Sequence, residues 1–326
     1  MKRTGIIIAF ICVAGFSLQG QQLPLYSQYL YNKYLINPAV AGSDGYTSFN
    51  LTARDQWAGI EGSPKIFSIS LQARVLKRGS FIKMLANDKT AYRPPNDGKM
   101  GFGGAIFSNS SGLINRTGIQ ASYSYHFWLN GSKQLSFGLS FNGYYLKIDQ
   151  NRINMVDKSD PILNSTLKRG VFVPDVSTGI YLLHRKYSLG FSAEQVLQAG
   201  LKLFNNAYSE YSLKRHYYLF GTYSLEKGAN HEIRPSFLLK MSEQLKPQAE
   251  AGITYQYKQS FWTGVSYRTG KTFIANLGVR SGRLYIGYAV DFTLTELQSI
   301  SNGTHEITVA IKYGDTLRKF RWIDRY

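Results

Sequence analysis

The residues of this sequence whose types and spacing suit acyl transfer are Ser122, Ser124 and His126, together with the distant Asp291. Ser and His at alternate positions face the same side of a β-strand, and a hydroxyl nucleophile needs a nearby imidazole and an orienting polar group. This set outlines an outer-membrane hydrolase as one hypothesis. The same alternation is the ordinary polar lining of a β-barrel lumen, and we favour that interpretation.

Metal and nucleotide binding have weaker signals. The histidines, at positions 126, 184, 216, 231 and 305, are spread singly, and no two of them have the spacing of metal ligands. Gly101, Gly103 and Gly104 lie within an expected strand and not at a strand-to-helix turn, so relief of crowding explains them better than a phosphate-binding loop does. The sequence therefore predicts no metal, no cofactor and no enzymatic activity.

Four charged residues are candidates for an ion network inside a barrel. Asp291 and Glu306 are expected to face inward near one end of it, and Arg268 and Arg280 are expected to join them. Such a network fills the interior, so a structural role is the one we favour.

The elements that must position these residues are β-strands, and the clearest lie in residues 271–292. Apolar residues alternate with smaller or more polar ones over 273–279 and again over 284–292, on both sides of a turn at 281–283. The second face, made of Gly, Ala, Asn, Arg and Asp, is too small and polar for the interior of a soluble β-sandwich. The pattern predicts a hairpin with an apolar outer face and a face toward a wet or partly filled lumen.

Composition favours an all-β membrane protein. The chain of 326 residues has 24 Tyr, 19 Phe and 31 Gly, as expected of many strands with aromatic girdles, and no window after residue 20 suits a membrane helix. Lys2 and Arg3 precede an apolar run over 5–16, which predicts an export signal over residues 1–20 and a place in the outer membrane. Cys12, the single cysteine, lies in that run. Without disulfides, the exported chain is expected to rely on a closed hydrogen-bonded barrel.

Residues 46–313 contain fourteen strand-like segments, which predict a transmembrane antiparallel outer-membrane β-barrel. The expected strands are 46–57, 66–76, 100–109, 113–129, 134–148, 174–183, 187–197, 215–225, 232–241, 247–257, 260–268, 272–280, 284–293 and 305–313. If the first strand rises outward, the short connections are periplasmic and 149–173, 198–214 and 294–304 lie outside, as this class of barrel prefers. The basic stretch 77–99 is the exception. Either it contacts something in the periplasm or the strand count is wrong by one.

Two segments flank the expected barrel. Residues 21–45 form a tyrosine-rich lead-in with turn signals at Asn37-Pro38 and Ala41-Gly42, and we expect them to lie inside or beneath the barrel as a plug. Residues 314–326 form a basic, aromatic tail, which is either a periplasmic docking peptide or disordered.

The formal net charge is +18, which becomes +16 when Lys2 and Arg3 leave with the signal. Nucleic acid is a poor partner, because the signal leads out of the cytoplasm and the basic residues are scattered over turns and loops. Lipopolysaccharide phosphates, acidic glycans and acidic proteins are the polyanions of an outer membrane. We favour solubility and contact with outer-membrane lipid and lipopolysaccharide over a specific anionic ligand.

Over nearly the whole mature chain, the sequence resembles the PorP/SprF family of type IX secretion system outer-membrane proteins. The matching motifs are Ser27-Gln28-Tyr29, Asn37-Pro38-Ala39-Val40-Ala41-Gly42, Arg54-Asp55-Gln56-Trp57, Gly101-Phe102-Gly103-Gly104, Ser122-Tyr123-Ser124-Tyr125-His126, residues 261–268, residues 287–291 and Gly303-Thr304-His305-Glu306. The resemblance implies a non-enzymatic barrel that works with the secretion and gliding apparatus. It implies two partners, a secreted adhesin with a type B C-terminal sorting domain and the periplasmic ring or other outer-membrane components of the system.

We predict partner-binding residues in the lead-in, the 303–306 loop, the basic insert and the tail: Ser27, Gln28, Tyr29, Asn37, Pro38, Gly42, Gly303, His305, Glu306, Lys83, Arg93, Arg321 and Trp322. On this hypothesis the outer loops engage the adhesin, while the lead-in, the insert and the tail face the periplasmic machinery. Plugging and bracing the barrel is the alternative role of the lead-in and loop residues. The alternative function is a channel or transporter for small or hydrophobic solutes, because an unplugged barrel of this size conducts.

Overall fold

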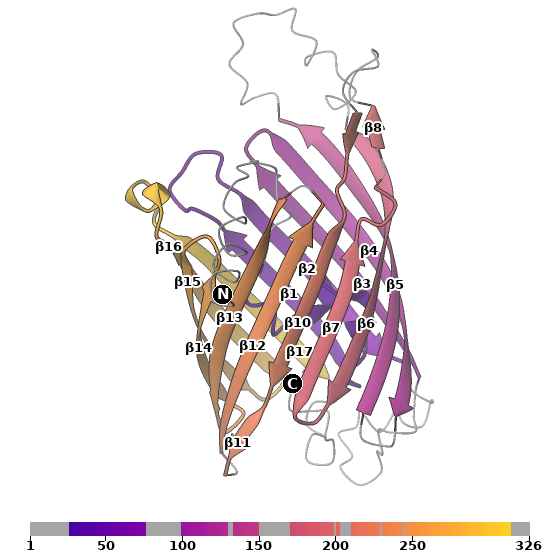
Figure 1. Ribbon diagram of the computed structural model, residues 1–326, viewed down its shortest axis with the longest axis vertical. Helices are drawn as coiled ribbons and strands as arrows, with labels where there is room; N and C mark the ends of the chain where they lie inside the picture. The colour runs from indigo at the N-terminus through magenta and orange to yellow at the C-terminus, as the bar shows by residue number, and fades with distance from the viewer. Residues whose placement is uncertain are drawn as a thin grey trace, which may run out of the picture.

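The computed structural model describes residues 26–75, 99–129, 133–149, 170–198, 200–202, 210–228, 230–243 and 245–313. Fourteen antiparallel strands form a closed barrel (Figure 1), so the predicted fold class is confirmed. The barrel strands are β1 (Thr47–Asp55), β2 (Lys65–Arg74), β3 (Met100–Ser111), β4 (Ile114–Leu129), β5 (Lys133–Ile148), β6 (Val171–His184), β7 (Tyr187–Glu194), β10 (His216–Tyr223), β12 (His231–Ser242), β13 (Leu245–Tyr257), β14 (Phe261–Arg268), β15 (Thr272–Ser281), β16 (Leu284–Thr293) and β17 (Thr304–Tyr313).

Three short strands supplement the barrel. β8 (Gly200–Lys202) and β9 (Glu210–Ser212) pair with each other as a separate hairpin, and β11 (Leu225–Lys227) pairs with the first residues of β12. The short helices are of the 3-10 type: η1 (Lys33–Leu35), η2 (Pro38–Val40) and η6 (Glu296–Ser299). In the part of the chain that the structure describes, no helix has the length and hydropathy needed to cross a membrane.

The barrel closes where the first strand meets the last. β1 pairs with β17 from Thr47 opposite Tyr313 to Asp55 opposite His305. β10 pairs with β7 on one side and with β12 on the other. Each barrel strand therefore has a hydrogen-bonded neighbour on both sides, as a strand surrounded by lipid requires.

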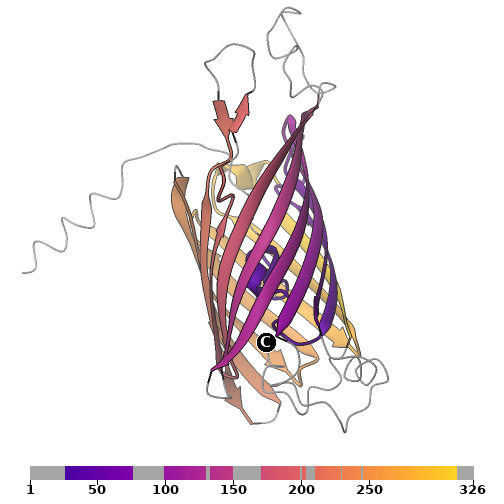
Figure 2. The same ribbon diagram turned by 90° about the vertical axis from the view of Figure 1, so that its right-hand side faces the viewer.

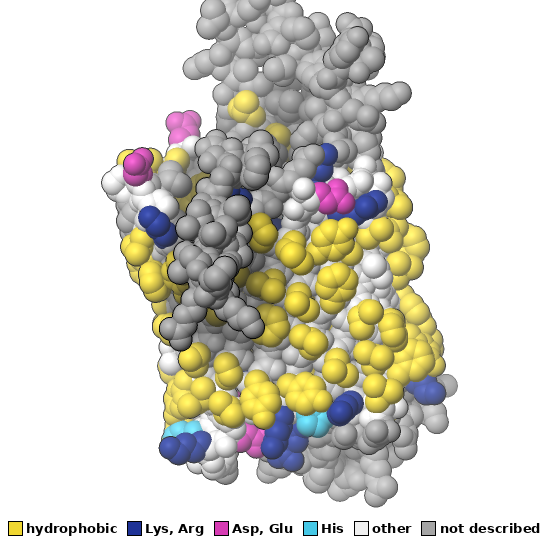
Figure 3. Space-filling view, in the orientation of Figure 1, with side chains coloured by type: hydrophobic (Ala, Val, Ile, Leu, Met, Phe, Trp, Pro, Cys, Tyr) yellow, Lys and Arg dark blue, Asp and Glu magenta, His cyan; other side chains and the backbone are white. Residues whose placement is uncertain are grey.

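The period-two alternation separates an apolar outside from a small and polar inside. In the predicted hairpin, now β15 and β16, Phe273 and Leu277 are 50% and 52% exposed, whereas Ile274 and Asp291 are each 2% exposed. Figure 3 shows the result as a broad apolar band on the outer wall. The predicted direction of both hairpin faces is confirmed.

Residues 26–46, the plug segment, lie inside the barrel, and Figure 2 shows η1 and η2 surrounded by strands. We name the end of the barrel where β1 ends and β2 begins the loop end, and the end where β1 begins and β17 ends the terminal end. Ser27 contacts Glu306 near the loop end, and Ser43 contacts Arg74 near the terminal end. The plug segment therefore runs through the lumen from one end to the other before β1 begins.

Several expectations lie outside the described residues or need correction. The signal over 1–20 and the tail over 314–326 are not described, and neither are residues 76–98 of the basic insert. The expected 303–306 loop is wrong in part, because β17 begins at Thr304 and carries His305 and Glu306 on opposite faces.

Candidate functional site

Five charged side chains meet in the lumen near the loop end and form the charged cluster: Arg54, Glu250, Arg268, Asp291 and Glu306. Arg54 Nη2 lies 2.7 Å from Asp291 Oδ2, and Arg54 Nη1 lies 3.0 Å from Glu306 Oε2. Arg268 lies 2.8 Å from a Glu250 oxygen and 3.3 Å from Asp291. All five are buried, so opposite charges and hydrogen bonds must replace the water that the charges lose.

The first residues of the plug segment complete this cluster. The backbone N–H groups of Ser27 and Gln28 donate to the two carboxylate oxygens of Glu306, each at 2.8 Å. The Ser27 hydroxyl donates to Asp291 at 2.6 Å. Because the cluster holds three carboxylates and two guanidinium groups, the donors from the plug segment supply stabilisation that the two arginines alone do not. The cluster therefore anchors the plug segment at the loop end.

Arg280, which we expected in this network, lies near the terminal end, so that part of the prediction is wrong. Its guanidinium is 5.2 Å from the centre of the Tyr285 ring. The antiparallel register pairs Arg280 with Tyr285 beside the turn, whereas Asp291 pairs with Ile274 several residues closer to the loop end. Both Arg280 and Asp291 face inward, but at opposite ends of the barrel.

Sequence reasoning did not place two residues of the cluster, Glu250 and Arg54. For Arg54 a local signal exists. The polar residues Ser48, Asn50 and Thr52 precede it at alternate positions of β1, and all of them are buried. This alternation is the signal that assigns Arg54 to the inward face. Its partners are 237 and 252 residues away in the chain, which no local pattern reveals.

Polar wall residues hold the middle of the plug segment. The Tyr34 hydroxyl lies 2.9 Å from Ser122 Oγ, and the Ser124 hydroxyl donates to the carbonyl oxygen of Ala41 at 2.6 Å. The Asn37 side chain donates to two wall carbonyl groups at 3.0 and 3.1 Å, and its Oδ1 accepts from the backbone N–H of Ala39 at 2.8 Å. Asn37 thus caps η2 and fixes it to the wall at the same time.

The hydrolase hypothesis needs Ser124, His126 and a carboxylate together. The structure brings Ser124 Oγ to 3.3 Å from His126 Nε2, but Asp291 lies toward the other end of the barrel. His126 Nδ1 lies 2.7 Å from Ser136 Oγ, while Asp291 is held by the two arginines of the charged cluster. The Ser124 hydroxyl is engaged with the plug segment, as described above. Among the described residues, no three His, Cys, Asp or Glu side chains gather as ligands of a metal ion.

Glycines in the wall provide the space into which the plug segment packs. At Gly138 a Cβ atom would overlap the backbone of Pro38 and Ala39, and at Gly103 it would lie 2.5 Å from the Tyr34 ring. Three more wall glycines would likewise collide with the plug segment if they carried a Cβ: Gly101, Gly179 and Gly287. The small residues on the inward face of the wall therefore make room for the plug segment and do not line an open pore.

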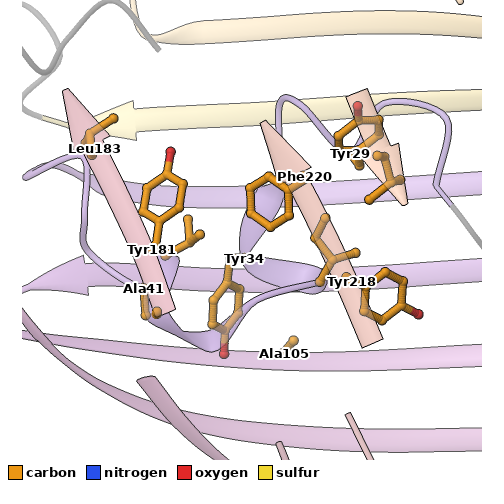
Figure 4. Close-up of a cluster of buried hydrophobic side chains, with 12 residues drawn as sticks. Tyr29, Tyr34, Ala41, Ala105, Tyr181, Leu183, Tyr218 and Phe220 are labelled. Atoms are coloured by element: carbon orange, nitrogen blue, oxygen red, sulfur yellow. The ribbon is translucent and has the colours of Figure 1, made fainter. Parts of the chain in front are cut away.

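Apolar packing reinforces these contacts. Tyr29 and Tyr34 of the plug segment are buried with Tyr181 and Phe220 of the wall (Figure 4). Burial of such aromatic side chains contributes on the order of 2 kcal/mol each to the free energy of folding. These side chains belong to a cluster of twelve buried residues, six of which come from the plug segment.

The terminal end of the plug segment is also hydrogen-bonded. Arg74 Nη2 and Gln134 Nε2 both donate to the carbonyl oxygen of Ser43, each at 3.1 Å. Lys33 on η1 donates to the Tyr181 hydroxyl at 3.3 Å and to Ser188 Oγ at 3.2 Å. The plug segment is therefore anchored at both ends and in the middle.

Lys33 predicts a pH dependence of stability. Burial lowers the pKa of Lys33 from its ordinary 10.5 to about 7. Between these values the folded protein binds fewer protons than the unfolded chain, so stability rises with pH, by at most about 3 kcal/mol from pH 7 to 9.5. Thermal unfolding in detergent should show this rise for the wild type and a smaller one for Lys33→Met. The exposed Lys271→Met should behave as the wild type, and a Lys33→Met protein with the full rise would contradict the prediction.

Two cavities lie on the two sides of the plug segment. One, near the loop end, encloses about 630 Å³, part of it open to solvent, and its lining includes Tyr26, Phe107, Arg116, Tyr144 and Glu194. The other, near the terminal end, encloses about 690 Å³, part of it open, and its lining includes Lys33, Arg234, Glu232, Trp262 and Lys312. The plug segment separates two vestibules.

The structure brings most of the predicted partner-binding residues into the barrel interior. Ser27, Gln28, Tyr29, Asn37, Pro38, Gly42 and Glu306 lie in contact between the plug segment and the wall. Gly303 and His305 lie at the loop end, where His305 Nδ1 is 2.7 Å from the Tyr288 hydroxyl on the outer face. Lys83, Arg93, Arg321 and Trp322 are outside the described residues.

Comparisons with known proteins give a family and a fold. The family model described as type IX secretion system membrane protein PorP/SprF matches residues 18–311. No curated protein matches the chain. Among solved structures, the toluene transporter TbuX of Ralstonia pickettii is 10% identical with a TM-score of 0.50, and the alignment covers 86% of this chain and 92% of that one. A variant of the monoaromatic hydrocarbon channel TodX is 10% identical with a TM-score of 0.48, covering 86% and 94%.

Proposed function

Since this chain belongs to the PorP/SprF family of type IX secretion system membrane proteins, we propose that it is a non-enzymatic outer-membrane docking protein of that system. In this role it binds a secreted adhesin with a type B C-terminal sorting domain and assists its secretion or its attachment to the cell surface. The observation that carries the proposal is the plug segment, which fills the lumen and is anchored along its whole length. A barrel filled in this way is suited to holding a partner and not to conducting solutes.

The loop end is the side on which we place the adhesin. The connections 149–170 and 195–215 there are long, whereas the connections at the terminal end, apart from 75–99 and the one between β10 and β12, are two or three residues long. The vestibule at the loop end is lined by aromatic rings and by Arg116, whose guanidinium lies 4.0 Å from the centre of the Tyr144 ring. Aromatic side chains and arginine are the residues that dominate protein interfaces.

Quantitative proteomics of the cell surface and medium tests this role in the protein's own host. Deletion of the gene should remove one or two proteins with type B sorting domains while other type IX cargo is unchanged. Loss of all type IX cargo would instead make the protein part of the core machinery. No change in either would contradict the proposed role in secretion.

A variant can assign the contact to the loop end. Arg116→Ala removes the cation that lies over Tyr144, and it should reduce the amount of the same cargo at the surface several-fold, because arginines buried at interfaces are worth about 2 kcal/mol or more. Lys65→Ala, at an exposed position of the same end, is the matched control and should leave the cargo unchanged. Equal effects of the two variants would argue against the vestibule as the docking site.

A solute channel is the second candidate function, because the barrel has the size for it once the lumen is open. The likeness to the toluene transporter concerns the fold alone. Single-channel recording of the purified full chain separates the two functions. A docking protein with its plug segment in place should show no steady open level, and a steady open level in the wild type would favour transport.

A further inference from the structure

The two ends of the barrel differ in charge. At the terminal end, the basic residues on the turns and strand ends, apart from those that face the lumen, are Lys99, Lys133, Arg185, Lys186, Lys227, Lys258 and Arg283, and we call this set the basic rim. The acidic residues in the described turns and strand ends of that end are fewer: Asp44, Glu226, which lies 3.6 Å from Arg185, and the buried Glu232. On the face that Figure 3 presents, Lys and Arg side chains lie along the lower margin of the molecule.

The loop end has no such excess among the described turns and strand ends whose exposure is known. Its basic residues there are Lys65, Lys147, Lys214, Arg215, Lys246 and Lys271, and its acidic residues are Asp55, Glu61, Asp149, Glu243 and Glu296. Two of these cations lie in ion pairs, Lys65 with Asp55 at 3.7 Å and Arg215 with Glu243 at 3.4 Å. Among the described residues, the excess of positive charge is therefore at the terminal end.

The basic rim borders a belt of aromatic and histidine side chains. The Lys258 ammonium group lies 5.2 Å from the centre of the Tyr257 ring, and the Arg283 guanidinium lies 5.4 Å from that of Tyr313. His231 in the same belt lies 2.7 Å from the Tyr255 hydroxyl. Amphipathic rings of this kind occupy the level of the lipid headgroups. The belt thus places the basic rim beside the phosphate groups of the adjoining leaflet.

We infer that the basic rim binds the phosphate groups of anionic phospholipids in the leaflet at the terminal end. The cations are distributed around the circumference, on the connections β4–β5, β6–β7, β10–β12, β13–β14 and β15–β16, and at the start of β3, as contact with a surrounding leaflet requires. Attraction of each basic residue to an anionic surface adds to that of the others and is screened by salt. This inference does not depend on the adhesin role.

The test is the number of lipid molecules retained by the purified full chain in native mass spectrometry after mixing with defined lipids. Phosphatidylglycerol should be retained in preference to phosphatidylcholine, and less of it at higher salt. The triple variant Lys133→Glu, Lys258→Glu, Arg283→Glu should lower the retained phosphatidylglycerol about tenfold. The matched control, Lys65→Glu, Lys147→Glu, Lys271→Glu, changes the net charge equally at the loop end and should stay within twofold of the wild type.

Three outcomes would overturn the inference. The first is equal retention of the two lipids by the wild type, and the second is an equal loss of retained phosphatidylglycerol in the two triple variants. The third is that the protein prefers lipid A and that only the loop-end variant retains less lipid. The corresponding Lys→Gln and Arg→Gln variants provide a second series if charge reversal prevents folding. Heat-modifiable migration in gels reports whether each barrel is folded. If lipid retention is unchanged while an acidic component of the secretion system is lost from pull-downs, the rim is a protein-binding surface instead.

Discussion

Replacement of Gly138 by leucine is expected to expel the plug segment and to turn the closed barrel into a conducting pore. Any side chain at Gly138 overlaps the backbone of Pro38 and Ala39 in η2. The hydrogen-bonded strands of the wall cannot move aside, so η2 must leave its place. The wall itself has fourteen strands and does not need η2 to close. Single-channel recording in planar bilayers should show steady openings for Gly138→Leu and none for the wild type.

Gly104→Leu is the matched control for this experiment. An added Cβ at Gly104 would have its nearest neighbour at 3.8 Å, the carbonyl oxygen of Gln120, so the substitution fits the existing structure and should leave the barrel closed. Gly103→Ala is a milder test, because the Tyr34 ring in its way is a side chain that can shift. A folded Gly138→Leu barrel that remains closed would show that the plug segment does not seal the lumen.

Loss of Arg54 is expected to destabilise the folded protein by about 3–5 kcal/mol, because it leaves buried carboxylates with too little positive charge. Arg54→Met keeps much of the side-chain volume but removes both ion pairs, to Asp291 at 2.7 Å and to Glu306 at 3.0 Å. It also removes the donor to Ser27 Oγ and so loosens the loop-end anchor of the plug segment. The midpoint of urea or thermal unfolding in detergent, followed by heat-modifiable gel migration, measures the effect.

The control for Arg54→Met is Lys65→Met at the same end of the barrel. Lys65 lies 3.7 Å from Asp55, and the two side chains are 69% and 42% exposed, so their ion pair is worth less than about 1 kcal/mol. The two variants should therefore differ several-fold in their effect on the free energy of unfolding. Similar small effects would mean that water reaches the charged cluster and that it is not the anchor described here.

Strand positions and faces were predictable because they depend on neighbours in the chain. Side chains two residues apart share a face, so the alternation at 273–279 and 284–292 was enough to assign the apolar wall and the inward faces of β15 and β16. The turn at 281–283 also contained the information needed to place Arg280 at the correct end of the barrel. The turn fixes the register that pairs Arg280 with Tyr285. The error was to consider which face the residue lies on and not its distance from the turn.

The contacts that close and fill the barrel were not predictable in this way. Arg54 meets Asp291 only because β1 pairs with β17 and so brings together residues 237 positions apart. The wall glycines looked like relief of crowding between strands, and only the path of residues 26–46 through the lumen shows that they receive a plug segment. Sequence alone determined a fourteen-strand barrel with a small, polar inner face. The sequence also suggested the lead-in as a plug. The tertiary structure decided its path through the lumen and the contacts that hold it there, because ion pairs and packing form between groups that are near in space and far apart in the chain.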